Sequence, residues 1–247
     1  MKRLAIALGA ASLLVAAPSA RAEDPPAPET QAPTNPALAP TGHTNRLKSM
    51  WRFELGYRGS FVREATFDPF STQDYFAQVS LGGSRTVYTR GRFSFAPGFM
   101  WDYGKTGATS RGDAASLEVH RLVIPLEGRL HFGAWGYAFL RTAPGIAEMS
   151  AEVDDPASPA NLTKSRWLFA TDVSAGYAYP LWPRDNPMDL TPRIWLQADS
   201  GYGWITPIGL NLAPDLPSSD PRIASGVDLG SLTMRGAFLR VAAAISY

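Results

Sequence analysis

The sequence predicts an all-β fold, an eight-stranded antiparallel up-and-down β-barrel that crosses a membrane. Three observations lead to this prediction. The stretch Phe238–Tyr247 alternates apolar residues with smaller, partly polar ones, which is typical of a strand with two unlike faces. About seven other segments alternate in the same way, each near the ~9–11 residues that a tilted strand needs to cross a bilayer. Short and long connections also alternate between the segments.

An export signal precedes the strands. Lys2 and Arg3 stand before an apolar run, Leu4 to Ala17, that is too short to span a bilayer as a helix. Residues 20–22 read Ala-Arg-Ala, a small-x-small cleavage site. We therefore expect residues 1–22 to be a signal peptide that is removed on export.

Residues 23–46 form a compositionally distinct segment. Six prolines are interleaved with Ala, Thr, Gln and Asn, and almost no large apolar residue is present. Such a segment cannot bury enough surface to offset its ordering entropy. We expect a disordered Pro-rich periplasmic linker, either a plain spacer or a partner-binding strip, followed by the barrel over residues 47–247.

Composition excludes several classes of function. Removing residues 1–22 takes away three of the 23 basic residues and none of the 22 acidic ones, so the mature net charge is −2. A nearly neutral chain offers no electrostatic basis for binding nucleic acid. The absence of cysteine excludes disulfides and thiolate metal sites.

The first expected strand shows the pattern that the others repeat. Trp51, Phe53 and Leu55 alternate with Arg52 and Glu54, an apolar set against a charged one. The eight expected strands are Trp51–Phe61, Tyr75–Gly82, Phe93–Tyr103, Arg121–Phe132, Trp135–Leu140, Trp167–Tyr179, Arg193–Trp204 and Phe238–Tyr247.

The connections fall into two classes. Short breaks are expected at residues 89–91 and 133–134, with a moderate one at 182–190. Long polar loops are expected at 63–74, 105–116, 152–165 and 207–230. Short turns opposite long loops are the topology of membrane barrels, and an even number of strands returns both termini to the same side.

Two architectures fit alternating strands. A soluble calycin-like barrel points its apolar set inward, whereas a membrane barrel points that set outward. Aromatic residues gather near strand ends, where interfacial girdles of a membrane barrel would lie, and this favours the membrane. The girdle residues are Trp51, Phe93, Trp101, Tyr103, Trp135, Trp167, Tyr179, Trp204 and Tyr247.

Three residues do not fit a regular barrel. Pro97 and Pro125 lie within expected strands, where each removes a ladder donor, so we expect a bulge or a break at each. Arg141 falls on the apolar register of the fifth strand, which would require a register shift or snorkelling.

The C-terminal residues Leu239, Val241, Ile245 and Tyr247 carry a family resemblance. From Trp51 onward the chain resembles the small eight-stranded outer-membrane proteins, the OmpA-transmembrane-domain and OmpX-like group, whose members usually end in Phe. The resemblance implies a bacterial outer-membrane location with both termini periplasmic. It also implies contact with outer-membrane lipid and lipopolysaccharide, and recognition of the last strand by the barrel-assembly machinery. It assigns no activity.

The inward set is predicted to form a charge network across the lumen, because isolated ions in a narrow interior are too costly. It could be a polar core that plugs the barrel, or a gate or narrow ion path. Since eight strands enclose an interior just wide enough for side chains, we favour the plug. The residues are Arg52, Glu54, Arg58, Asp102, Arg121, Glu127, Arg129, Asp172, Arg193, Asp199 and Arg240.

Catalysis has one weak candidate site. His120 and Glu118 are two residues apart on one strand face, with Ser116 beyond them, which allows a Glu–His pair on the outer wall. Some eight-stranded barrels edit lipid A, but their His-x-Ser element is absent here, and a solvated rim histidine is the alternative explanation. We expect no cofactor, and no metal site, because no His/Asp/Glu cluster has ligand spacing.

The sequence thus predicts a non-enzymatic outer-membrane barrel with an envelope-structural or surface-interaction role through its outer loops. The first alternative is a small pore, transport or lipid-handling barrel. The second is a lipid A-modifying enzyme.

Overall fold

The computed structural model describes residues 51–110, 113–154, 161–181, 192–214 and 226–247. The expected signal peptide (1–22) and Pro-rich linker (23–46) lie outside these residues. None of the described residues lies in a helix long and apolar enough to cross a membrane. The elements are β1(Trp51–Phe61), β2(Tyr75–Arg85), β3(Tyr88–Arg90), β4(Phe93–Ser110), β5(Asp113–Val123), β6(Leu126–His131), the 3-10 helix η2(Gly133–Trp135), β7(Tyr137–Thr142), β8(Gly145–Asp154), β9(Leu162–Pro180), β10(Arg193–Ile205), β11(Ile208–Pro214), β12(Val227–Leu232) and β13(Arg235–Ser246).

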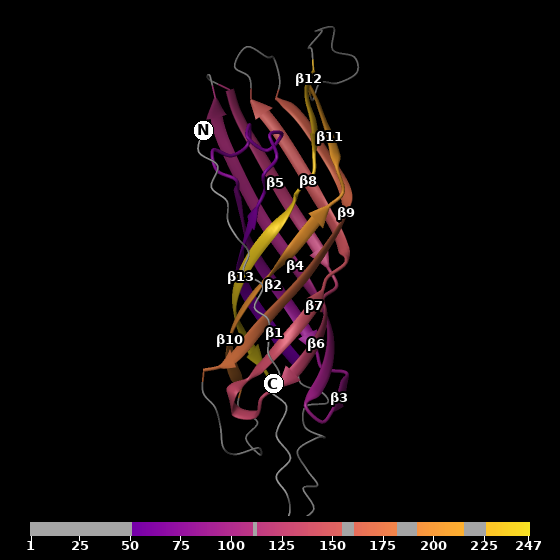
Figure 1. The fold of residues 1–247 in the computed structure, drawn as a ribbon. Coiled ribbons are helices and arrows are strands. Elements are labelled where there is room, and N and C mark those ends of the chain that lie inside the picture. The colour runs from indigo at the N-terminus through magenta and orange to yellow at the C-terminus, as the bar shows by residue number, and fades with distance from the viewer. Residues whose placement is uncertain (1–50, 111–112, 155–160, 182–191, 215–225) are drawn as a thin grey trace, which may run out of the picture. The chain divides into compact units, whose positions relative to one another are not determined.

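The strands pair antiparallel in one sheet that closes on itself (Figure 1). β1 closes the barrel by pairing with β13, from Arg52 opposite Ser246 to Ser60 opposite Phe238. The thirteen strands of the described residues make eight wall strands, because β2–β3, β5–β6, β7–β8, β10–β11 and β12–β13 are each two halves of one wall strand. The predicted eight-stranded antiparallel up-and-down barrel is therefore confirmed.

The barrel has a terminal end and a distal end. The terminal end is where β1 begins and β13 ends, and the distal end is where Ser110 of β4 pairs with Asp113 of β5. Each wall strand therefore has a terminal half and a distal half.

Prolines mark three interruptions within wall strands. Pro125 separates β5 from β6, Pro144 separates β7 from β8, and Pro207 separates β10 from β11. Proline lacks a backbone N–H, so it cannot complete the ladder. The break expected at Pro125 is present, whereas β4 continues through Pro97, whose absent N–H faces the interval between β2 and β3.

In the terminal half, the wall has an apolar outer face and a polar inner face. Phe53, Leu196 and Val241 are 46%, 47% and 47% exposed, whereas Glu54 and Arg240 are 8% and 1% exposed. Strict alternation along each strand separates the two sets, as a pleated strand requires. Apolar side chains therefore cover the outside of this half, as the sequence predicts.

In the distal half, the two faces exchange character. On β5, Leu117 and Val119 point inward and are fully buried, while Ser116, Glu118 and His120 lie on the outer face. The expectation of a polar lumen is therefore wrong for this half. The buried apolar residues here, the distal core, are Val62, Phe67, Phe70, Phe76, Leu117, Val119, Ala147, Met149, Ala151, Leu162, Leu168, Ala170, Ile205, Ile208, Leu210, Leu212, Leu232 and Met234.

The segment between β1 and β2 supplies two large residues of the distal core. Phe67 and Phe70 are 1% and 0% exposed, and Phe67 makes an edge-on contact with Phe76 of β2 at 6.3 Å between ring centroids. Backbone bonds from the Phe67 N–H to the Glu64 carbonyl and from the Phe70 N–H to the Phe67 carbonyl fold the segment back. This connection is a loop, as predicted, but it packs inside the barrel wall.

Three of the four expected long loops contain strand residues. Within residues 105–116, β4 runs to Ser110 and β5 starts at Asp113. Within 152–165, β8 runs to Asp154 and β9 starts at Leu162, and within 207–230 both β11 and most of β12 form. The period of two continues there, but apolar residues occupy the inner face and polar ones the outer face. Residues 111–112, 155–160 and 215–225 lie outside the described residues.

The register expected for the fifth strand is also wrong. Tyr137 and Phe139 point inward and are buried, whereas Leu140 points outward and is 69% exposed. The cause is η2, a turn with positive φ at Gly133 and Gly136 that interrupts the alternation after Trp135. A Cβ on Gly136 would lie 2.0 Å from the Ala178 carbonyl oxygen, so only glycine fits.

Replacing Phe70 by alanine should destabilise the barrel, because it empties a fully buried site in the distal core. The expected loss of unfolding free energy is about 3–5 kcal/mol, measured by urea unfolding of the refolded protein. Val227→Ala, at an exposed position of β12, is the matched control and should change stability by less than about 0.5 kcal/mol. Equal effects of the two substitutions would contradict the distal core.

Candidate functional site

The barrel interior in the terminal half is the first candidate site. Ten of the eleven charged residues predicted for the lumen are buried there, and Arg193, near the terminal end, is half-buried. Arg141 joins them, because the shifted register of β7 points it inward. The buried set is Arg52, Glu54 and Arg58 of β1, Asp102 of β4, Arg121 of β5, Glu127 and Arg129 of β6, Arg141 of β7, Asp172 of β9, Asp199 of β10 and Arg240 of β13.

Four of these residues form the Asp172 cluster, which borders the distal core. Arg58 binds both carboxylate oxygens of Asp172, the bidentate geometry that a guanidinium favours. Arg121 Nη2 lies 2.6 Å from Asp172 Oδ2, and its Nη1 lies 3.5 Å from Asp102 Oδ2. Ser80 donates a 2.6 Å hydrogen bond to Asp102. The cluster holds two cations and two anions.

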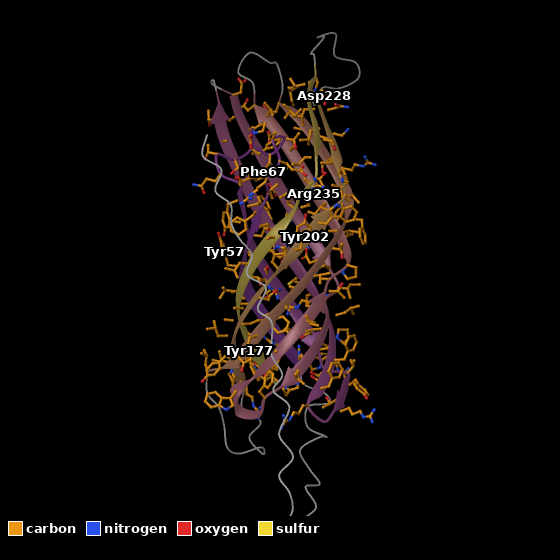
Figure 2. The ribbon with its side chains drawn as sticks, in the orientation of Figure 1. Tyr57, Phe67, Tyr177, Tyr202, Asp228 and Arg235 are labelled. Atoms are coloured by element: carbon orange, nitrogen blue, oxygen red, sulfur yellow. The ribbon has the colours of Figure 1, made fainter. Side chains whose placement is uncertain are left out.

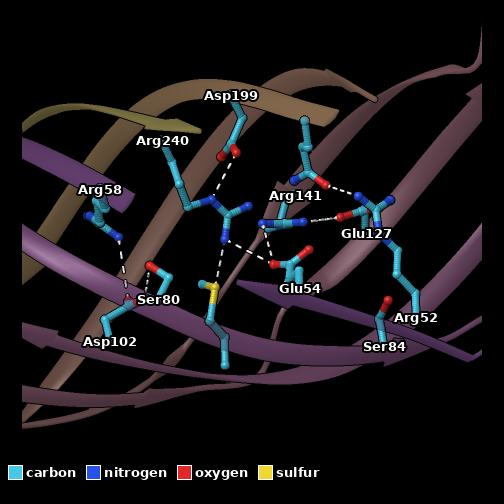
Figure 3. Close-up of polar contacts among 12 residues, drawn as sticks. Arg52, Glu54, Arg58, Ser80, Ser84, Asp102, Glu127, Arg141, Asp199 and Arg240 are labelled. Atoms are coloured by element: carbon cyan, nitrogen blue, oxygen red, sulfur yellow. Dashed lines mark hydrogen bonds and ion pairs between the residues drawn. The ribbon is translucent and has the colours of Figure 1, made fainter. Parts of the chain in front are cut away.

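Six residues form the Glu54 cluster, nearer the terminal end, and Figure 3 labels five of them, all except Arg129. Arg240 bridges two acids, with Nε 2.9 Å from Asp199 Oδ1 and Nη1 3.2 Å from Glu54 Oε1. Arg141 also bridges two acids, with Nε 2.9 Å from Glu127 Oε2 and Nη1 3.5 Å from Glu54 Oε1. Three cations balance three anions. The members are Glu54, Glu127, Arg129, Arg141, Asp199 and Arg240.

Arg52 belongs to neither cluster. It is 1% exposed and donates to the Gln197 side-chain oxygen, and no ion pair joins it to a described carboxylate. Its guanidinium carbon lies 5.5 Å from the Tyr137 ring centroid and 5.9 Å from that of Trp195, within cation–π range.

The interior leaves little free space around these clusters. A cavity of about 20 Å³ lies beside Arg58, Arg121 and Asp172, and another of about 10 Å³ lies beside Arg141 and Arg240. A single water needs about 10–15 Å³, so each cavity has room for about one water. The clusters and the distal core together fill the barrel.

The outer-wall trio of catalytic candidates is only partly assembled. His120 Nε2 lies 3.0 Å from Glu118 Oε1, and Lys105 Nζ lies 3.4 Å from Glu118 Oε2. The bond from His120, followed by the charge of Lys105, holds the pKa of Glu118 below its ordinary value despite the opposing effect of burial. Ser116 lies four residues from His120 along β5, roughly 13 Å in an extended strand, which is too far for a nucleophile–base contact.

His120 instead packs on aromatic rings. Its ring centroid lies 4.8 Å from that of Tyr103 and 6.2 Å from that of Trp101. In the described ranges, no group of three or more His, Cys, Asp or Glu residues could hold a metal ion. The arrangement at His120 is therefore a stacked aromatic rim with a surface ion pair.

The predicted girdle residues all lie on the outside of the barrel wall. In the distal band, Tyr103, His120, Glu148 and Trp167 stand directly opposite one another on β4, β5, β8 and β9. In the terminal band, the exposed fraction is 47% for Trp51, 46% for Phe93, 70% for Trp135, 40% for Tyr179 and 61% for Tyr247. Figure 2 shows other tyrosines, such as Tyr57 and Tyr202, on the same outer surface.

A groove that the sequence did not reveal opens on the outer wall, where β13 leaves β1. It has a volume of about 520 Å³, with Phe61 and Tyr202 on its apolar side and Arg63 and Arg235 on its basic side. Glu64 is held by Arg235 at 3.4 Å and by the Thr233 N–H at 2.7 Å. The two arginines come from opposite ends of the chain, so only the closing of the barrel brings them together. The groove is also lined by Gly236 and Ala237.

Comparison with models of protein families gives no match, and comparison with curated proteins gives no match either. Among solved structures, the attachment invasion locus protein Ail of Yersinia pestis in complex with the heparin analogue sucrose octasulfate is similar, with TM-score 0.47 and 11% identity. A second structure of Ail gives TM-score 0.45 and 10% identity. Both alignments cover 81% of this chain and 99% of the Ail chain.

Replacing Asp172 by asparagine should destabilise the barrel strongly, because Arg58 and Arg121 both lose their main counter-charge while remaining buried. Breaking a buried ion pair from one side costs about 3–5 kcal/mol. Thermal unfolding followed by circular dichroism measures the loss. Asp74→Asn, at an exposed loop position, is the control and should leave the midpoint nearly unchanged. A midpoint for Asp172→Asn equal to that of the control would show that the cluster does not stabilise the fold.

Proposed function

We propose that this chain is a bacterial outer-membrane β-barrel with both termini in the periplasm. Its proposed role is in envelope structure or surface interaction, without catalysis of a reaction. The outer face of the terminal half supports the membrane location, because Leu55, Phe99, Val173 and Leu239 are each more than half exposed. Soluble monomers rarely expose apolar patches larger than a few hundred Å². In a bilayer the same belt would contact lipid, and closure leaves no strand edge in that belt unpaired.

The exchange of faces along the wall strands supports the same location. A soluble barrel in water would keep its apolar side chains inside along its whole length. Here the outer face is apolar up to the row of Tyr103 and Trp167 and polar beyond it, at Glu118, Ser150 and Ser165. That row would lie at the outer bilayer–water interface, where amphipathic aromatic rings are enriched.

The filled interior is the observation that carries the proposed role. Two balanced charge clusters occupy the terminal half, and the distal core blocks the other half. The cavities between them each have room for about one water, so the part of the interior that the structure describes offers little space for an aqueous path. The barrel would therefore act through its outer surface.

The distal wall offers such a surface. β4, β5, β8, β9, β11 and β12 continue beyond the aromatic row and would stand above the membrane. A shallow groove of about 410 Å³ lies on this wall, lined by small residues such as Gly107 and Ala115 and by polar ones such as Glu152 and Asn161. A rigid wall of this kind suits contact with another surface, because little ordering entropy is lost on binding.

Two partners are part of the proposal. Arg63 and Arg235 would contact the phosphates of outer-leaflet lipid or lipopolysaccharide, with the acyl region against Phe61 and Tyr202. The barrel-assembly machinery would recognise β13, whose outward set ends in Tyr247.

The protein should show no stepwise conductance in planar lipid bilayers, because its interior is filled. The inserted fraction is verified by heat modifiability: folded protein migrates differently from boiled protein on an SDS gel. Reproducible single-channel steps from a sample that passes this check would favour the alternative of a small pore.

Replacing both Arg63 and Arg235 by glutamine should weaken binding of lipopolysaccharide by about tenfold, because about 1.4 kcal/mol of charge-assisted contact is lost. Native mass spectrometry of the protein with titrated lipopolysaccharide measures this change. Arg90→Gln, an exposed position at the terminal end, is the control and should bind as the unmodified protein does. Binding that falls equally in the control would indicate a non-specific effect of net charge.

A further inference from the structure

The outer groove is built on well-anchored backbone. β13 holds Arg235 in place by pairing it with Trp204 of β10. Next to it, a Cβ on Gly236 would lie 1.8 Å from the Phe61 carbonyl oxygen, so only glycine fits at the floor of the groove. Arg63 directly follows a residue of the distal core. Both arginines therefore extend into the groove from backbone that packing and pairing hold in place.

Glu64 is a fixed part of the groove wall. One of its carboxylate oxygens accepts a 2.7 Å hydrogen bond from the Thr233 N–H, and the other lies 3.4 Å from Arg235 Nε. The Glu64 backbone carbonyl also accepts the N–H of Phe67, which is buried in the distal core, at 2.9 Å. The Glu64 side chain is 17% exposed, whereas that of Arg235 is 60% exposed. An incoming anion can reach Arg235, but it meets a carboxylate that is already in place.

The charges that line the groove leave an excess of one positive charge. Arg63 and Arg235 supply two cations, and Glu64 supplies one anion. The other residues that line the groove are uncharged: Phe61, Tyr202, Gly236 and Ala237 (Figure 2). One monovalent anion would therefore balance the groove, whereas a divalent anion would place a second negative charge near Glu64 without a cation of its own.

Lipid phosphates differ in this respect. A phosphodiester carries one negative charge. A phosphomonoester carries nearly two at about pH 8, because its second pKa is about 6. The groove distinguishes the two classes by charge, since the chain places one carboxylate beside the two arginines.

We propose that the outer groove selects a lipid headgroup with a monoanionic phosphodiester, as in phosphatidylglycerol, over one with a dianionic phosphomonoester, as in phosphatidic acid. Glu64 is the residue that sets this selectivity. Arg63 and Arg235 bind the phosphate, and the acyl chains lie against Phe61 and Tyr202. This inference rests on the proposed contact of the two arginines with phosphate, and it adds the class of phosphate and the residue that selects it.

A competition experiment tests the selectivity. The folded protein in detergent is mixed at about pH 8 with equal amounts of phosphatidylglycerol and phosphatidic acid that have identical acyl chains, and native mass spectrometry measures the two bound populations. Diacylglycerol with the same chains gives the background of binding without phosphate. Bound phosphatidylglycerol should exceed bound phosphatidic acid about fivefold, the factor produced by repulsion between two unit charges about 4 Å apart in water. A preference for phosphatidic acid overturns the proposal.

Two variants raise the charge of the groove by one and should remove the selectivity. Glu64→Gln keeps the shape of the side chain and an oxygen for the Thr233 N–H. Ala237→Lys adds a cation at an exposed lining position and leaves Glu64 untouched. In each variant the ratio of phosphatidylglycerol to phosphatidic acid should fall to about one or below. Heat modifiability verifies that each variant is folded.

Asp74→Asn is the matched control for these variants. It removes a carboxylate from the same connection between β1 and β2, at an exposed position that does not line the groove, and it should keep the fivefold ratio. If Glu64→Gln and Ala237→Lys also keep that ratio, the charge of the groove does not select the headgroup, and the proposal is overturned.

The same measurement separates the selectivity from the phosphate contact itself. In the double variant Arg63→Gln, Arg235→Gln, both phospholipids should fall to the diacylglycerol background. If the unmodified protein binds both phospholipids only at that background, the phosphate contact fails and the selectivity fails with it. If both bind equally above the background, the contact stands and the selectivity alone is overturned.

Discussion

The pairing of β1 with β13 is the interaction on which the rest of the structure depends. It joins the two ends of the described chain, from Arg52 opposite Ser246 to Ser60 opposite Phe238, and it turns a sheet into a closed wall. Closure leaves no open strand edge where β1 meets β13. It also separates the inner face of the sheet from the outer face. Every charged side chain on the inner face must then find its partner inside. The same pairing brings Arg63 and Arg235 together at the outer groove.

The interior is filled in two different ways. In the terminal half, arginines and carboxylates from seven of the eight wall strands pair across the lumen, and this pairing offsets part of the desolvation penalty. In the distal half, apolar residues fill the space, with Phe67 and Phe70 inserted from a loop. The Asp172 cluster lies where the two parts meet. A barrel filled by charge clusters and by an apolar core has little interior space, which favours the proposed role at its surface over the alternative of a pore.

The sequence predicted the barrel, the number of wall strands and the orientation of the faces in the terminal half, because a period of two is a local signal that burial on one face imposes. It failed where the signal was interrupted or ambiguous. The turn at Gly133 and Gly136 shifts the alternation by one residue, which is one of the two explanations that Arg141 on the apolar register requires, but the sequence does not locate the shift. The prediction of loops for the distal strands is wrong, because their outer face is polar and proline interrupts one of them at Pro207. The outer groove and the isolation of Arg52 depend on contacts between distant strands, which no local pattern contains.

The proposed membrane location explains why the apolar and polar faces exchange along the wall strands. If water surrounded the whole wall, an apolar outer face at Phe53 and Val241 would be costly, and the inner face would be the apolar one throughout. If lipid surrounded the whole wall, the polar outer face at Glu118 and Ser165 would be equally costly. The same strands carry both arrangements, which is what the proposed membrane location predicts, with the boundary between two media crossing the strands. In that proposal the boundary lies at the aromatic row through Tyr103, because amphipathic aromatic rings are most favourable at the interface between lipid and water.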